Sequence, residues 1–304
     1  MTAINWKTLL ILACLKIPQV GSYNAKKFLR TVTDVKAVID DFNILKESSV
    51  RPIRQAIKKG ILTAEVWSKY VELSLQEVEK AALLQIEIIN FEEECYPQNL
   101  LTLHNYPTII YAQGNIKLLN APKIVAIIGT RTPTDFGIET CRYITEWFVQ
   151  QDYVIVSGLA KGCDTFAYQT ALEHDGKTIA ILAAGLDQPI YPQSNVELVK
   201  KILDHDGLVI STYPLGTKLF PKFLAARDEW QSGISNGVVV VETGLKGGTH
   251  CTINFALEQR RMVAICDQIP AAGNLKYLQI NSKLIRGISS PASLVDFVKQ
   301  MDVL

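Results

Sequence analysis

The spacing of apolar residues divides the chain into two parts with different periods. Up to about residue 85, apolar residues recur every three or four positions, as at Leu9 and Leu12, which is typical of helices that bury one face. A break at Ile17–Gly21 favours several short helices over one long helix. Short runs of β-forming residues then replace this pattern. The sequence therefore predicts a small helical domain over residues 1–85 and a second domain over residues 86–304.

In the second part, apolar runs typical of buried strands alternate with helix-like patterns, such as those at 139–150 and 195–203. Apolar strands joined by helices indicate an α/β domain with a mostly parallel sheet and helices on both faces. The expected strands are Ile86–Phe91, Thr108–Tyr111, Lys123–Ile128, Tyr153–Ser157, Thr178–Leu182, Leu208–Ser211, Gly237–Glu242 and Met262–Cys266.

One turn in the helical part has a pattern of its own. Ile17-Pro18-Gln19-Val20-Gly21, followed by a helix, resembles a helix-hairpin-helix turn. In such a turn, a glycine lets the backbone bend tightly and directs amides towards a phosphate. A plain helical packing domain is the alternative, and the pattern alone leaves both open.

The composition limits how this chain can bind a charged partner. It has 31 basic and 30 acidic residues, a formal net charge of +1, so a nucleic acid would have to be bound by a local cluster of cations. The 48% of hydrophobic residues is enough for a packed core and argues against disorder.

The cysteines and the apolar runs indicate the compartment. None of the six cysteines forms a CxxC pair, so we expect reduced thiols without a zinc site or a disulfide framework. The N-terminal apolar run Leu9–Leu15 is too short to cross a bilayer and has no cleavage pattern. We therefore expect a soluble cytoplasmic protein that makes no contact with a membrane.

Glycine-rich turns follow two predicted neighbouring strands. Gly129, Thr130 and Arg131 follow the first, and Ser157-Gly158-Leu159-Ala160-Lys161-Gly162 follows the second. Ligands of open α/β sheets bind beyond the carboxyl ends of the strands, where glycine permits close approach and Arg and Lys suit phosphate. The pattern is not the three-glycine dinucleotide fingerprint. An ordinary strand-turn-helix is the alternative.

A third turn stands at a predicted helix start. Gly247, Gly248 and Thr249 follow a strand that ends in an acid, and free amides at a helix start favour an anion. Glu242 and His250 nearby suggest acid–base chemistry or a metal, but a metal site needs at least three converging ligands. We expect neither a metal nor a cofactor.

Taken in order, these features resemble the DNA-processing protein A (DprA/Smf) family over roughly residues 5–290. That family carries a Gly-Ser-Arg strand end, a Ser-Gly-Leu-Ala-x-Gly-Ile-Asp loop, a Gly-Leu-Asp turn with Tyr-Pro, an Arg-Asn-Arg segment and a Ser-Gly-Ser turn. The corresponding segments here are Gly129–Arg131, Ser157–Asp164, Gly185–Asp187 with Tyr191-Pro192, Arg227–Ser235 and Glu242–Thr252.

The resemblance implies an extended Rossmann domain behind a small helical domain of the SAM or helix-hairpin-helix type. It implies a protein without catalytic activity that binds and protects single-stranded DNA, passes it to a RecA-type recombinase in natural transformation and recombination, and forms homodimers. Arg131, Lys161 and Arg227 match positions expected to contact DNA phosphates.

Several departures from the family pattern bear on the ligand. Asp228 and Glu229 replace the asparagine and the second arginine of Arg-Asn-Arg, and two acids beside a phosphate track repel it. The alternative function is therefore a protein that binds or cleaves nucleotides, similar to the cytokinin-activating, lysine-decarboxylase-like group, with a role in defence against foreign DNA. Glu242 would be the carboxyl group that such a nucleotide-cleaving enzyme needs.

Overall fold

The structure is a computed structural model that describes residues 4–301. These residues form two compact units. The first contains the chain up to Tyr96 together with His104–Tyr111, and the second contains Pro97–Leu103 and the chain from Ala112 onwards. The domain assignment of 1–85 and 86–304 stays a prediction.

The first unit consists mainly of short helices, as the apolar spacing predicted. Residues Thr8–Cys14 of its first helix are all buried, so this helix is enclosed on every side instead of presenting one apolar face. The elements are α1 (Trp6–Leu15), α2 (Ser22–Leu29), α3 (Val35–Asp40), α4 (Asn43–Lys46), α5 (Arg51–Lys58), α6 (Ala64–Leu83), β1 (Glu87–Asn90) and the first half of the neighbouring strand β2 (Ile109–Gly114), up to Tyr111.

The turn before α2 differs from its expected geometry. Gly21 caps the helix with a φ of −91°, which any residue adopts, whereas Gln19 has the left-handed φ of 66°. The bend therefore depends on Gln19 and not on the glycine. A helix-hairpin-helix role for this turn stays a prediction.

The second unit contains seven parallel strands in the order β6-β5-β4-β3-β7-β8-β9. The order reverses between β3 and β7: β4, β5 and β6 lie on one side of β3, and β7, β8 and β9 lie on the other side. The bounds are β3 (Ile124–Ile128), β4 (Val154–Ser157), β5 (Thr178–Leu182), β6 (Leu208–Ser211), β7 (Gly237–Val240), β8 (Met262–Cys266) and β9 (Ile285–Ile288).

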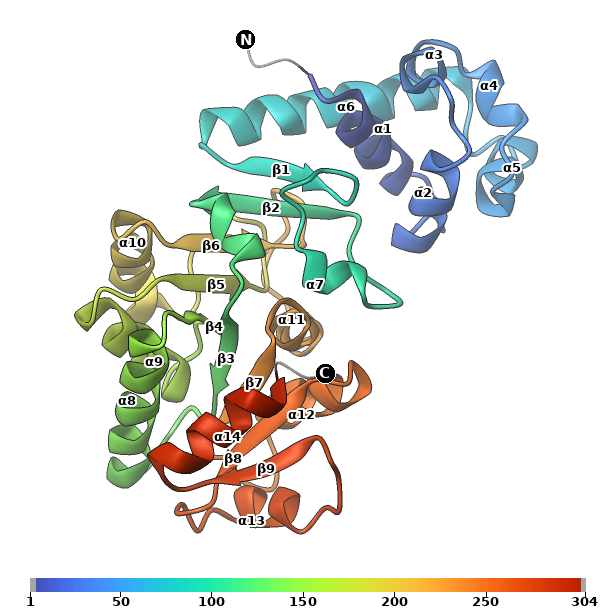
Figure 1. Ribbon diagram of the computed structural model, residues 1–304. Coiled ribbons are helices and arrows are strands. Elements are labelled where there is room, and N and C mark those ends of the chain that lie inside the picture. The colour runs from blue at the N-terminus through green and yellow to red at the C-terminus, as the bar shows by residue number, and fades with distance from the viewer. Residues whose placement is uncertain (1–3, 302–304) are drawn as a thin grey trace. The chain divides into compact units, whose positions relative to one another are not determined.

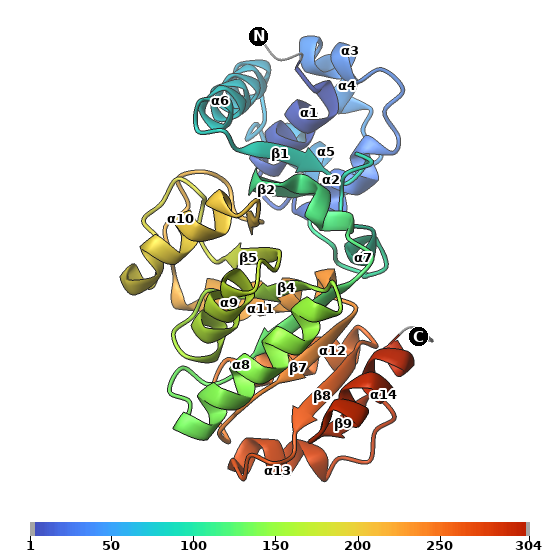
Figure 2. The same ribbon diagram turned by 60° about the vertical axis from the view of Figure 1, so that its left-hand side comes forward.

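Helices cover both faces of this sheet, which confirms the predicted extended Rossmann-type α/β architecture (Figures 1 and 2). One face carries α8 (Asp135–Gln150), α9 (Cys163–Glu173), α10 (Val196–Asp204) and α14 (Pro291–Met301), whose buried residues pack on the strands. The opposite face carries α11 (Pro221–Ile234) and α12 (Thr249–Glu258), which contact each other. The short elements are α7 (Gln98–Leu101), α13 (Ala272–Leu278) and the 3-10 turns η1 (Ile116–Asn120) and η2 (Gln193–Asn195).

A buried tyrosine fixes the strand end that leads into the second glycine-rich turn. The hydroxyl of Tyr168 on α9 lies 2.8 Å from the backbone nitrogen of Ser157, whose N–H donates to it, and 2.9 Å from the carbonyl of Ile179. Tyr168 is fully buried, so water cannot replace these partners. The hydroxyl therefore joins α9 to the carboxyl end of β4 and to the first half of β5.

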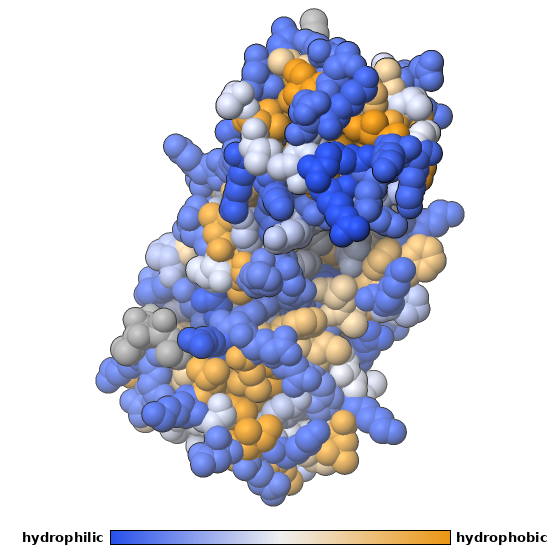
Figure 3. Space-filling view, turned by 90° about the vertical axis from the view of Figure 1, so that its right-hand side faces the viewer, coloured by the Kyte–Doolittle hydropathy of each residue, from blue (hydrophilic) through white to orange (hydrophobic). Residues whose placement is uncertain are grey.

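The described residues include no helix that is long and apolar enough to cross a membrane. On the face shown in Figure 3, hydrophilic residues cover most of the surface and apolar residues gather in separate patches. In the second unit, every residue of the strands β3, β4, β5, β6, β7 and β8 is buried.

Tyr168→Phe is expected to lower the free energy of unfolding by about 1–3 kcal/mol, because it removes one hydroxyl and leaves the buried N–H of Ser157 without its acceptor. Urea unfolding measures this loss. Tyr143→Phe on the exposed side of α8 removes the same atom and serves as the control, with no change expected. Equal unfolding curves for the parent and Tyr168→Phe would show that this hydroxyl has no structural role.

Candidate nucleic-acid interface

A cavity of about 510 Å³ lies at the carboxyl ends of β3 and β7, where the strand order of the sheet reverses. Such a switch point is the usual ligand position in open α/β sheets. The cavity is lined by the turn after β3, by one side of α11 and by the segment that leads into α12; the lining includes Gly129–Arg131, Ala160, Asp164, Leu224, Arg227, Asp228, Gln231 and Lys246–Thr249.

The turn after β3 is held against two neighbouring segments. The N–H of Thr130 donates to the carbonyl of Glu242 over 2.7 Å, and the carbonyl of Thr130 accepts from the N–H of Cys163 over 3.1 Å. A Cβ on Gly129 would meet the side chain of Cys163, so only glycine fits there without a shift of its neighbours. The first predicted phosphate turn is thus a rigid part of the sheet edge.

The second turn packs directly on the first. Gly162 has a left-handed φ of 78°, and a Cβ on it would lie 2.6 Å from the carbonyl carbon of Arg131. This close approach brings two exposed side chains, Arg131 and Lys161, onto adjacent loops. The structure therefore places these two predicted cations at the same edge of the sheet.

A buried carboxylate determines the shape of the second turn. Oδ2 of Asp164 accepts hydrogen bonds from the N–H groups of Gly158 and Ala160, at 3.0 and 3.1 Å. Burial raises the pKa of the Asp164 carboxyl, and the guanidinium of Arg227 opposes that rise. Asp164 therefore holds two amides of the second glycine-rich turn, and neither of these N–H groups is free to donate to a phosphate.

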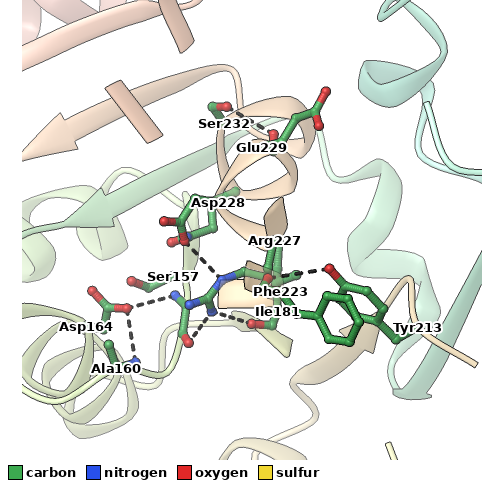
Figure 4. Close-up of polar contacts among 12 residues, drawn as sticks. Ser157, Ala160, Asp164, Ile181, Tyr213, Phe223, Arg227, Asp228, Glu229 and Ser232 are labelled. Atoms are coloured by element: carbon green, nitrogen blue, oxygen red, sulfur yellow. Dashed lines mark hydrogen bonds and ion pairs between the residues drawn. The ribbon is translucent and has the colours of Figure 1, made fainter. Parts of the chain in front are cut away.

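Arg227, which the resemblance assigns to contact with DNA phosphates, is directed into the protein. It is only 4% exposed, and Nη1 donates to the carbonyls of Gly158 and Ile181. Its Nε donates to Oδ1 of Asp228 over 3.1 Å (Figure 4). Three donors are used within the protein, so Arg227 positions the strand ends and is not part of the exposed set of cations.

Ser157 is also used internally. Its side chain is fully buried, and Oγ donates to the carbonyl of Ile127 over 2.7 Å, which joins β4 to β3. Gly158 is buried too, and it packs so closely on Arg227 that a Cβ there would collide with the guanidinium. Both residues shape the site from within, and neither offers an exposed group to a phosphate.

The two acids that depart from the family pattern lie in different places. Asp228 lines the cavity, whereas Glu229 does not, and Figure 4 shows the Glu229 side chain directed away from Arg227. Burial, with a smaller contribution from Glu258, raises the pKa of Glu229. Only one of the two acids therefore faces a ligand in the cavity.

The third predicted turn leads into α12 as expected. Gly247 and Gly248 are exposed, Gly247 has a φ of 132°, and the helix begins at Thr249. Oγ1 of Thr249 donates to the carbonyl of Gly129 over 3.1 Å, which joins this turn to the first one. Lys246 is a further exposed cation at the cavity that the sequence analysis did not select.

Glu242 and His250 have structural partners. Oε2 of Glu242 accepts from the N–H and the hydroxyl of Thr134, each at 2.9 Å, at the start of α8. The ring nitrogens of His250 lie 2.7 Å from the Tyr277 hydroxyl and 2.9 Å from the Gly244 carbonyl. Within residues 4–301, no group of three or more His, Cys, Asp or Glu side chains is placed to hold a metal ion.

Residues 87–299 match the family model described as DNA recombination-mediator protein A. Two curated relatives, each named DNA processing protein DprA, are similar to this chain. The Streptococcus pneumoniae protein is 36% identical over 171 residues, and the Bacillus subtilis protein is 33% identical over 205 residues. The matched segments cover 56% and 66% of this chain, and 59% and 68% of the two relatives.

Two solved structures resemble the whole chain or most of it. DNA processing protein A from Streptococcus pneumoniae has a TM-score of 0.73 and 25% identity, and the match covers 96% of this chain and 98% of that one. The Helicobacter pylori protein, whose single-stranded DNA binding mode is described, has a TM-score of 0.63 and 26% identity over 71% of this chain and 96% of that one.

Arg227→Ala is expected to lower the free energy of unfolding by about 3–5 kcal/mol, because it leaves the buried carboxyls of Asp164 and Asp228 without their cation. Chemical denaturation measures the loss. Arg131→Ala, which removes an exposed arginine from the same cavity, is the matched control and should unfold like the parent. A stable Arg227→Ala protein would contradict the structural role assigned to Arg227.

Asp228→Asn is expected to change how stability depends on pH. Burial raises the pKa of Asp228 from 3.8 to about 6, against the opposing effect of Arg227, so the folded state disfavours its ionised form. The stability that this group contributes is therefore complete below about pH 4 and is lost as the pH rises through about 6. The asparagine variant should lack this decline in thermal melts recorded across that range, whereas parallel pH profiles would exclude a shifted Asp228.

Proposed function

This chain belongs to the DNA recombination-mediator protein A family, and from that premise we propose that it binds and protects single-stranded DNA. The phosphates lie along Arg131 and Lys161, with Lys246 and the Gly247–Thr249 turn as further contacts. The proposal takes its ligand from relatives named as DNA processing proteins and from the Helicobacter pylori structure.

One observation carries the proposal: the close packing of Gly162 on Arg131, which sets two exposed cations on adjacent loops at the switch point of the sheet. The chain has a net charge of only +1, so a local cluster of this kind is required to attract a polyanion. The start of α12, which has no side-chain cap, adds a partial positive charge on the same edge.

The biological setting follows from the family. The protein would work in the cytoplasm as a homodimer, pass single-stranded DNA to a RecA-type recombinase and serve natural transformation or recombination. The two curated relatives are matched over 59% and 68% of their length, so this setting and these partners are part of the proposal.

The structure offers no support for the alternative of a nucleotide-cleaving enzyme. Its acid, Glu242, is engaged by Thr134 at the start of α8 and does not line the cavity. That alternative stays a prediction, and release of free base from a nucleotide by the purified protein would establish it.

We expect a fluorescent oligo-dT strand to bind more tightly than its duplex, with an affinity that falls as salt increases. Arg131→Ala and Lys161→Ala should each weaken binding and reduce the salt slope by about 0.7, the value for one phosphate contact with a single strand. Fluorescence anisotropy at several salt concentrations measures both quantities.

Lys123→Ala is the matched control for these variants. Lys123 is an exposed cation at the amino end of β3, whereas Arg131 follows the carboxyl end of the same strand. It should retain the affinity and the salt slope of the parent. If Lys123→Ala weakened binding as much as the other two variants, net charge and not the switch-point edge would account for DNA binding.

A further inference from the structure

The helix α5 of the first unit presents a row of positive charges to solvent. Arg51, Arg54 and Lys58 are exposed, whereas Ile53 and Ala56 on the other side of the helix are buried. Residues three, four and seven positions apart lie on the same side of a helix, so the three cations form one line along α5. No acidic residue occurs between positions 48 and 64. The charge on the exposed face of this helix is therefore positive over its whole length.

These charges are not balanced within the protein. In the part of the chain that the structure describes, none of the three side chains forms an ion pair. Arg54 donates from Nη1 to the carbonyl of Ser48 over 2.7 Å, but a neutral acceptor leaves the positive charge in place. Like charges on one face of a helix repel each other. An anionic ligand that spans the row would remove this repulsion.

Arg51 opposes the helix on which it stands. The N-terminal end of a helix carries a partial positive charge, so acids stabilise that end and cations destabilise it. Arg51 is the first residue of α5, and the first turn contains no acidic residue that could offset its charge. Lys58 stands in the last turn, where a cation is favourable. The stability of the helix therefore accounts for Lys58 but not for Arg51.

A nucleic-acid backbone fits this row better than a membrane does. An amphipathic helix binds a bilayer by inserting its apolar face, but Ile53 and Ala56 are enclosed in the helical unit. From Arg51 to Lys58 the helix rises roughly 10 Å, a length over which one strand of DNA carries about three phosphates. The guanidinium of arginine also donates to a phosphate through two parallel N–H groups. The row thus matches a line of phosphates in charge, in length and in its donors.

We propose that the exposed face of α5 is a second contact surface for nucleic-acid phosphates, separate from the cavity at the carboxyl ends of β3 and β7. The proposed function assigns the phosphates to the second unit, whereas α5 belongs to the first, so the inference goes beyond that function. The surface does not involve the turn Ile17–Gly21, which contains no basic residue. Because phosphates carry no sequence information, this contact binds all base sequences alike.

Charge reversal at Arg51 tests this surface in the full chain. Arg51→Glu should weaken the binding of a long fluorescent oligo-dT strand about tenfold at low salt, and it should reduce the salt slope by at least about 0.7, because a phosphate contact is lost. The same change should maintain or raise the melting temperature, since an acid at the first position of α5 is favourable. Anisotropy at several salt concentrations measures the first effect, and thermal melts measure the second.

Lys69→Glu is the matched control, because Lys69 is an exposed cation on α6 of the same unit and undergoes the same change in charge. It should bind oligo-dT nearly as tightly as the parent. Lys58→Ala gives a second measurement at the other end of the row, where it should reduce the salt slope by about 0.7. Arg51→Glu combined with Arg131→Ala should weaken binding by the product of the two separate effects, since independent contacts add in free energy.

The outcomes separate this inference from the proposed function. If Arg51→Glu and Lys58→Ala both bind DNA as Lys69→Glu does, the α5 surface is overturned, while a loss of binding in Arg131→Ala still supports the proposed function. If Arg51→Glu weakens binding and Arg131→Ala does not, the α5 surface stands and the cavity is not the DNA site. A parent that binds no DNA at any salt concentration overturns both.

Two further outcomes assign the row to another role. A loss of DNA binding accompanied by a lower melting temperature in both Arg51→Glu and Lys58→Ala makes the row structural and overturns the inference. Vesicles that contain phosphatidylglycerol are tested in parallel with the parent and the same two variants. Variants that lose vesicle binding but keep DNA binding identify a membrane as the ligand of α5, which also overturns it.

Discussion

The candidate site depends on one buried cation. Arg227 extends from α11 beneath the strand ends, where it donates to the carbonyls of Gly158 and Ile181 and to the carboxylate of Asp228. Asp164 lies close enough for this guanidinium to offset part of the effect of burial on its pKa. A buried charge is tolerated only when it is paired and hydrogen-bonded, so these partners and Arg227 require one another.

The rest of the site is arranged around this group. Asp164 fixes the loop after β4 through two amides, that loop packs on the turn after β3, and Thr249 joins the start of α12 to the same turn. The exposed cations are therefore mounted on segments that are linked to one another. Such linkage limits the ordering that a ligand must impose, and it is a condition for tight binding by few contacts.

Much of this could be predicted from the sequence. Nearly continuous apolar runs predicted the strands from β3 to β8, because strands buried on both faces have few polar positions. Glycines at strand ends predicted the switch-point edge. The strand β9 was missed because its central residues Arg286 and Gly287 are not fully buried and give no apolar run. The inward direction of Arg227 and the separation of Asp228 from Glu229 were also missed, because composition specifies a charge but not the direction of its side chain.

Residues 227 to 229 of α11 show what that direction decides. Successive residues of a helix point about 100° apart, so three adjacent charges serve three surroundings: the sheet, the cavity and the neighbourhood of Glu258 on α12. A rotation of the helix by one residue would place a different charge in each. The same three residues would then present a different charge to the cavity. The packing of α11 on α12 fixes the rotation of the helix, and so it fixes which of the three charges faces the cavity.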